Sequence, residues 1–164
     1  MARRSLTLVL LLVLRGAAFT TAQEVAVIVH PANRLEALSI ADLREILLME
    51  RQHWAIGARI YVLLPETGTP EKDLLLEQVL KMKETELKRH YLAKLYAGEI
   101  PSFPRIASSN PAARRTVARA ANAIAVVETT ELDDTVKVLR IDGRRPGEAG
   151  YILATSHPAR RGRP

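Results

Sequence analysis

The apolar residues of the chain alternate between strand-like runs and helix-like spacing. Four short runs rich in β-branched residues are typical of strands and cover 24–31, 59–64, 123–128 and 136–142. Between them, apolar residues recur every third or fourth position over 39–48, 69–80, 85–97 and 109–122, which is typical of amphipathic helices. The order strand, helix, strand, helices, strand, strand predicts an α/β sheet with right-handed crossovers.

Local signals mark where these predicted helices begin and end. Ser39 with Asp42 three residues later predicts a capping box. Thr69 and Asn110 each stand directly before a proline, and this pattern predicts a polar cap followed by proline at the first helical position. Gly98 is placed to end the third helix in a left-handed conformation.

The N-terminus has the pattern of a secretory signal peptide covering residues 1–22. Arg3 and Arg4 precede the apolar run 6–14, and small residues around Ala22 provide a cleavage site. A retained membrane anchor is the alternative, but Arg15 ends the run well short of the roughly 20 apolar residues that a spanning helix needs. The sequence therefore predicts a periplasmic or otherwise exported protein without a membrane span after cleavage.

Composition narrows the functional classes. The 164 residues, 48% of them hydrophobic, suffice for one domain with an ordinary core. The formal net charge of +6 is less informative than it looks, because three arginines leave with the signal peptide and three more lie in the tail at 160–163. The arginines in the signal peptide and the tail do not form a clustered basic face, so nucleic-acid binding is not predicted. With no cysteine in the sequence, thiol catalysis, disulfides and cysteine-ligated zinc are excluded.

Motifs for catalysis and metal binding are weak. The four histidines, His30, His53, His90 and His157, lack metal-ligand spacing. Ser108 and Ser109 lack the Gly-x-Ser-x-Gly setting of a hydrolase nucleophile. We therefore predict a protein that is not an enzyme and that has no cofactor and no metal site. The aromatic side chains Trp54, Tyr91, Tyr96 and Phe103 are predicted to pack in the core rather than to stack on a ligand.

An ordered series of motifs over about residues 25–142 carries a family resemblance. It comprises "LSIADLREILL", Trp54 before a glycine and a strand, a "TGT" helix start, "ELKRHYLAKLYAG", a proline-rich link and "ANAIAVVETTELDDTVKVLRIDG". The series resembles the short periplasmic proteins related to the phosphate-binding components of bacterial ABC importers, in the type 2 periplasmic binding protein-like family. In full-length phosphate binders, two α/β lobes close over the anion.

The resemblance implies a fold and a set of partners. It implies a single lobe of the type 2 periplasmic binding protein-like fold, with a mixed sheet flanked by helices, over 23–143. Residues 144–164 would then be a C-terminal extension that is basic at its end. The implied function is non-enzymatic solute binding related to transport, with phosphate or another small oxyanion as ligand and an ABC importer as partner.

The family's ligand motif is an arginine, a short spacer and Ser-Gly-Thr at a helix start, and Thr67, Gly68 and Thr69 match its last part. Leu63 stands where the arginine is expected, and Glu66 would repel an anion. Thr67–Thr69 could therefore be an oxyanion site or only a helix cap, with Arg59 or Arg105 as substitute cations if the fold brings either near. The alternative function is an envelope protein-protein interaction module that keeps the fold without ligand binding.

Overall fold

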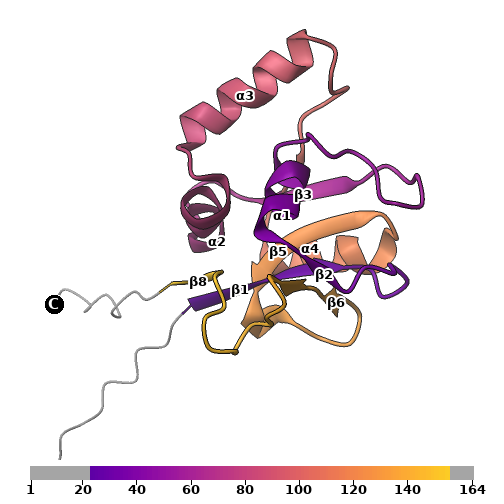
Figure 1. Ribbon diagram of the computed structural model, residues 1–164, viewed down its shortest axis with the longest axis vertical. Coiled ribbons are helices and arrows are strands. Elements are labelled where there is room, and N and C mark those ends of the chain that lie inside the picture. Colours follow the sequence, from indigo (N-terminus) through magenta and orange to yellow (C-terminus); the bar gives the residue numbers. More distant parts are fainter. Residues whose placement is uncertain (1–22, 156–164) are drawn as a thin grey trace, which may run out of the picture.

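The computed structural model describes residues 23–155, which form a mixed sheet covered by helices on both faces (Figure 1). The main sheet has the strand order β4-β3-β5-β1-β6, and β8 also pairs with β1. The small β2-β7 pair lies apart from it. The strands are β1 Gln23–Val29, β2 Ala37–Leu38, β3 Tyr61–Pro65, β4 Arg105–Ala107, β5 Ala123–Glu128, β6 Lys137–Val138, β7 Arg140–Ile141 and β8 Ala154–Thr155.

Both strand directions occur in the main sheet. β3 runs parallel to β4 and β5, with Leu63 opposite Arg105 and Ala125. β1 runs antiparallel to β5, with Val27 opposite Val126, and antiparallel to β6 and β8. The predicted α/β mixed sheet flanked by helices is therefore confirmed.

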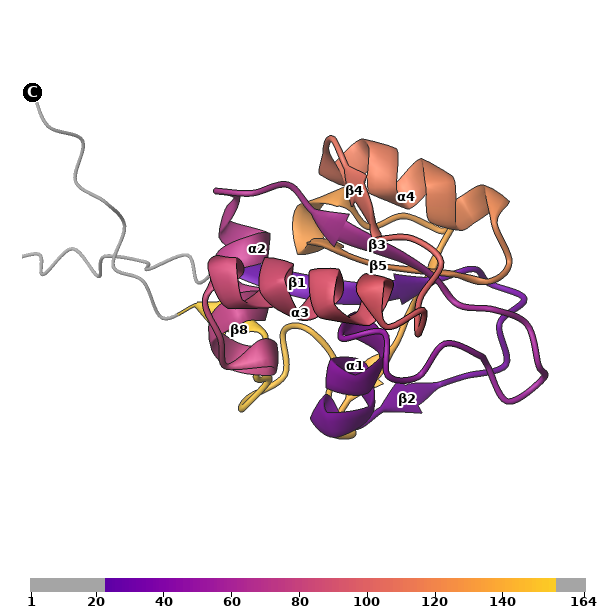
Figure 2. The ribbon, with the colours of Figure 1, turned by 90° about the horizontal axis from the view of Figure 1, so that it is seen from above.

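The helices divide between the two faces of the sheet. They are α1 Ile40–Leu47, α2 Pro70–Leu74 with a π-helical continuation Leu75–Leu80, α3 Glu84–Tyr96 and α4 Asn110–Arg119. Figure 2 shows α4 on one side of the strands and α1 on the other. Successive side chains of each strand point to opposite faces of the sheet. On β1, for example, Val27 packs in the cluster with α1 and α2, whereas Ile28 packs with α4.

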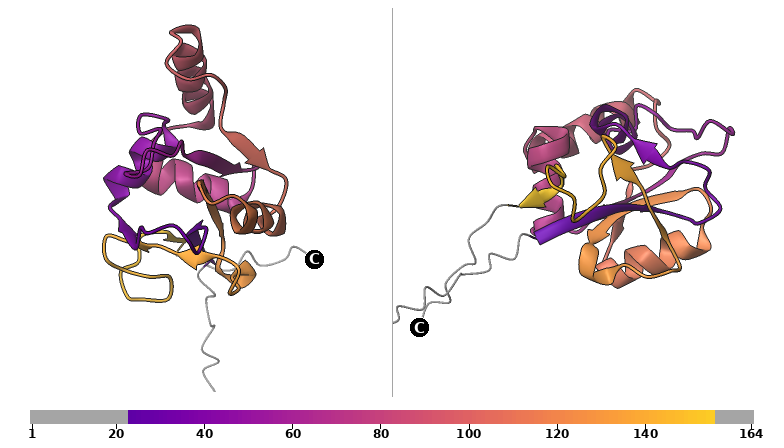
Figure 3. Two further views of the ribbon diagram at one scale, coloured as in Figure 1. Left: turned by 90° about the vertical axis from the view of Figure 1, so that its right-hand side faces the viewer. Right: turned by 60° about the horizontal axis from the view of Figure 1, so that its bottom comes forward.

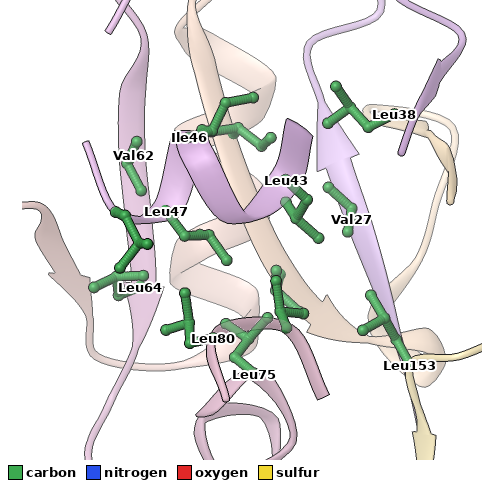
Figure 4. Close-up of a cluster of buried hydrophobic side chains, with 14 of the residues drawn as sticks. Val27, Leu38, Leu43, Ile46, Leu47, Val62, Leu64, Leu75, Leu80 and Leu153 are labelled. Atoms are coloured by element: carbon green, nitrogen blue, oxygen red, sulfur yellow. The ribbon is translucent and has the colours of Figure 1, made fainter. Parts of the chain in front are cut away.

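The larger core lies between the sheet and the α1–α2 layer. Leu43, Ile46 and Leu47 on one face of α1 meet the π-helical segment and the sheet, as the close-up in Figure 4 shows. The core on the α4 side is thinner and uses small side chains, including Ala113 and Ala125. This difference follows from the sequence, since α4 carries alanines where α1 carries leucine and isoleucine.

Most helix boundaries follow their sequence signals. Ser39 and Asp42 form the predicted capping box, Thr69 caps α2 before Pro70, and Gly98 after α3 has φ +71°. One cap prediction is wrong: Ser109, not Asn110, caps α4, because the Ser109 hydroxyl accepts from the Ala112 N–H at 3.3 Å. The Asn110 side chain instead donates a hydrogen bond to Glu71.

The chain after residue 143 contributes to the same core. Leu153 is fully buried, and the Tyr151 hydroxyl donates to the Val25 carbonyl at 2.9 Å. β8 then pairs with the start of β1, with Gln23 opposite Thr155 (Figure 3). Packing therefore continues past the predicted domain edge at residue 143, as far as the described residues reach.

The predicted signal peptide, residues 1–22, and the basic tail end lie outside the described residues. Within 23–155, no helix has the length and apolar character needed to cross a membrane.

Candidate functional site

The loop between β3 and α2 carries the three residues predicted to bind a ligand. Gly68 has φ +80°, a left-handed conformation that favours glycine, and it turns the chain from the strand into the helix. The Thr69 hydroxyl donates to the Glu66 carbonyl at 2.9 Å and accepts from the Lys72 N–H at 3.4 Å. This is the geometry of an N-cap, so Thr69 uses its hydroxyl within the loop.

Thr67 is directed away from Thr69. Its hydroxyl donates to the Glu84 carboxylate at the start of α3, at 2.5 Å. Thr67 and Thr69 line two different cavities, one on each side of the loop. The structure therefore keeps the three residues adjacent in the chain but does not bring the two hydroxyls to one point.

The cavity beside Thr69 lies where three parallel strands end. It has a volume of about 230 Å³ and lies beyond the carboxyl ends of β3 and β4, next to the starts of α2 and α4. Ligands of open α/β sheets bind at this kind of position. Its polar lining consists of Glu66, Thr69, Glu71, Ser108, Ser109, Asn110 and Glu131.

A carboxylate of the protein itself lies between the two helix starts. Glu71, in the first turn of α2, is only 4% exposed and accepts from the Asn110 side-chain amide at 2.5 Å. Asn110 is the first residue of α4. A helix N-terminus attracts negative charge, because its free N–H groups carry about half a positive charge. Glu71 therefore places a negative charge of the protein itself at these helix starts.

The lining of this cavity is acidic. Glu66 and Glu131 line it together with Glu71, and no lysine or arginine among residues 23–155 lines it. The two substitute cations considered from the sequence lie elsewhere: Arg59 donates to Gln52, and Arg105 donates to the Tyr61 hydroxyl. Neither guanidinium lines the cavity, so no lysine or arginine of the described part of the chain offsets these carboxylates for an incoming anion.

Two of the four aromatic candidates pack in the core as predicted. The Trp54 N–H donates to the Asn122 carbonyl at 3.0 Å, and Tyr91 is buried, so the prediction that these two rings pack in the core is confirmed. Tyr96 and Phe103 are 87% and 47% exposed, so that prediction is wrong for them. Within the described ranges, no group of three or more His, Cys, Asp or Glu residues could hold a metal ion.

Sequence reasoning missed the roles of Glu71 and Asn110. Locally, Glu71 looks like an ordinary acidic residue in a first helical turn. In the fold it is buried and bonded to Asn110 at the start of another helix, 39 positions further along the chain. The available signal was the pair of proline-containing helix starts, each following a strand that the sheet places side by side.

Comparison with solved structures shows the same overall fold. A putative phosphate ABC transporter substrate-binding protein from Clostridium perfringens, solved with bound phosphate, matches with a TM-score of 0.62 and 22% identity over 76% of this chain and 47% of that one. The chain has the periplasmic binding protein fold. An ABC-type phosphate transport receptor from Vibrio cholerae matches this fold with a TM-score of 0.65 and 14% identity, over 81% of this chain and 54% of that one.

The periplasmic binding protein fold is supported at the level of structure alone. The chain spans about half the length of the solved structures that it matches. No protein-family model matches the sequence, and no curated protein is significantly similar to it.

Proposed function

We propose that the protein is an exported, non-enzymatic lobe of the periplasmic binding protein type that does not bind oxyanions at Thr67–Thr69 and acts as an interaction module with an envelope protein. The observation that carries this proposal is the buried Glu71 carboxylate, held by Asn110 between the starts of α2 and α4. It supports the view that the Glu71 carboxylate takes the place of a bound oxyanion.

The electrostatics favour loss of the ligand over weak retention. A helix N-terminus alone provides about half a positive charge, and salt screens it at physiological ionic strength. Glu66, Glu71 and Glu131 line the cavity, and their negative charges repel an anion that enters it. Phosphate or sulfate entering this cavity would meet these carboxylates, and no guanidinium within 23–155 lines the cavity to offset them.

A phosphate titration followed by thermal unfolding tests this part of the proposal. At about 10 mM phosphate, a site with a dissociation constant of about 0.1 mM would stabilise the protein by about 2.7 kcal/mol. We expect no stabilisation beyond that given by sodium chloride at equal ionic strength, because the cavity is acidic.

The control for this titration is the double variant Thr67→Ala/Thr69→Ala. It should be less stable by about 1 kcal/mol from the lost cap, but equally indifferent to phosphate. Stabilisation of the wild-type protein that disappears in the double variant would show that Thr67–Thr69 bind the anion and would overturn the proposal.

The face at the carboxyl ends of β3 and β4 is the proposed contact surface. The resemblance to two-lobed binders implies a second lobe over this face, and residues 23–155 form one lobe only. Ser108 and Glu66 are exposed there, and Glu131 is half-buried. This polar, acidic face suits a partner with complementary basic groups.

Site-specific photo-crosslinking in envelope extracts tests the partner. A photoreactive residue in place of Ser108 should give a discrete protein adduct, because it lies at the proposed contact surface. The matched control is Ala121, also exposed but located before β5, at the opposite end of the parallel strands. The absence of adducts at Ser108, or the same adducts from both positions, would contradict the interaction.

A further inference from the structure

A second, larger cavity lies on the other side of the Thr67–Thr69 loop. It has a volume of about 450 Å³ and lies between α3, the end of β3 and the segment that enters β4. Its walls are mainly apolar and include Leu64, Leu87, Tyr91 and Phe103. A volume of this size is in the range of cavities that hold small organic molecules.

One end of this cavity is charged. Lys72 from α2 and Glu84 and Lys88 from α3 lie there. Glu84 already accepts from the Thr67 hydroxyl and pairs with Lys88 at 3.5 Å. Two ammonium groups therefore face one carboxylate that is already engaged, so this end has a surplus of one positive charge.

Lys72 is the unusual member of this group. Its side chain lines the cavity although the residue is only 3% exposed. Among the residues that the structure describes, no carboxylate lies within 4.0 Å of its ammonium group and no side-chain hydrogen bond is formed by it. Lysine is almost never buried without a partner, because removing an ammonium from water is costly.

Other parts of the cavity lining are apolar and open to solvent. Leu92, Phe103 and Ile106 are 42%, 47% and 54% exposed, although all three are large hydrophobic residues. They lie together on the cavity lining, whereas exposed apolar side chains on a soluble protein are usually scattered. An apolar body placed in this cavity would cover them and leave its polar end near Lys72.

We propose that this cavity binds a small amphiphilic carboxylate, whose apolar body packs against Leu87, Tyr91 and Phe103 and whose carboxylate pairs with the Lys72 ammonium. A monoanion matches the surplus of one positive charge, and an apolar aliphatic or aromatic body matches the walls. The site differs in residues and in ligand chemistry from the acidic cavity beside Thr69, so it goes beyond the proposed function and can fail or succeed independently of it.

Octanoate and octanamide are the probes, because they share an apolar body and differ in the charge of the head group. Titration calorimetry on the purified protein should give a dissociation constant at least about tenfold lower for octanoate, since a charge-assisted contact contributes more than a neutral one. Equal affinities for the two probes, or no binding of either at millimolar concentration, would overturn the proposal.

Variants locate the contact. Lys72→Met keeps the apolar stem and should bring the affinity ratio of octanoate to octanamide close to one, while octanamide binding is unchanged. Lys88→Met is the matched control: its side chain is 66% exposed, so the ratio should change by less than about threefold.

Phe103→Ala should weaken both probes alike, because Phe103 belongs to the apolar wall. Retention of the full ratio in Lys72→Met would place the carboxylate elsewhere and contradict the proposed contact.

Discussion

Replacement of Leu153 by alanine is expected to lower the free energy of unfolding by about 3 kcal/mol, as is typical of leucine-to-alanine changes in a packed core. Leu153 is fully buried, and its carbonyl accepts from the Val25 N–H at 3.0 Å, so the residue is held against β1. Urea unfolding should show a lower midpoint with an unchanged slope, because the extent of surface exposed on unfolding stays similar.

Ile152 is the matched control for Leu153, since it is the preceding residue and is 37% exposed. Ile152→Ala should cost less than about 1 kcal/mol, because a half-exposed side chain loses less burial and leaves no closed cavity. Equal, small effects at both positions would mean that the chain after residue 143 does not belong to the core.

Replacement of Lys72 by methionine is expected to raise the free energy of unfolding by about 1–3 kcal/mol, because exchanging buried ionic groups for apolar groups of similar volume often stabilises by about this much. Burial lowers the pKa of the Lys72 ammonium, while Glu84 raises it and Lys88 lowers it further. A lowered pKa means that the folded state disfavours the charged form, so the charge opposes folding at neutral pH.

The pH dependence gives a second readout for Lys72. Below its folded pKa the full penalty is present, and the penalty is relieved as pH rises from that value towards the ordinary 10.5 of lysine. The stability gap between Lys72→Met and the wild-type protein should therefore narrow as pH approaches 10.5.

Lys88→Met, at the exposed rim of the same cavity, should change stability by less than about 0.5 kcal/mol. A Lys72→Met variant that is less stable than the wild-type protein at neutral pH would show that Lys72 has a favourable internal partner.

The sequence predicts elements well where their own residues provide both the pattern and the boundary. The strand at 123–128 coincides with β5, and α1 begins after the predicted capping box of Ser39. In these cases β-branched runs and hydroxyl caps act over a few residues. The local residues alone are then sufficient to predict where the element begins and ends.

Elements defined by distant partners were not predictable in the same way. The expected strand at 136–142 divides into β6 and β7, because the Leu139 N–H donates to Val27 and the Arg140 N–H donates to Glu36. The short strands β2 and β8 depend on pairing with β7 and β1, respectively. Each of these strands has only two residues, too few to show the alternating apolar pattern of a strand in the sequence.

For the candidate site, the sequence located the loop but not its electrostatic environment. The absence of an arginine before Thr67 and the presence of Glu66 were visible in the sequence. The burial of Glu71 was not, because it requires Asn110 from another helix. Likewise, the isolation of Lys72 depends on α2 and α3 enclosing it.

The position of β1 in the sheet has a consequence for the order of folding. This N-terminal strand lies inside the sheet, and all three strands that pair with it come late in the chain: Val25 pairs with Glu128, Ile28 with Val138 and Glu24 with Ala154. Contacts between residues so far apart in sequence close large loops and form slowly. When the chain is synthesised from its N-terminal end, β1 therefore has none of its paired strands until residues 123–155 have emerged. An interior strand made first waits for the last third of the molecule.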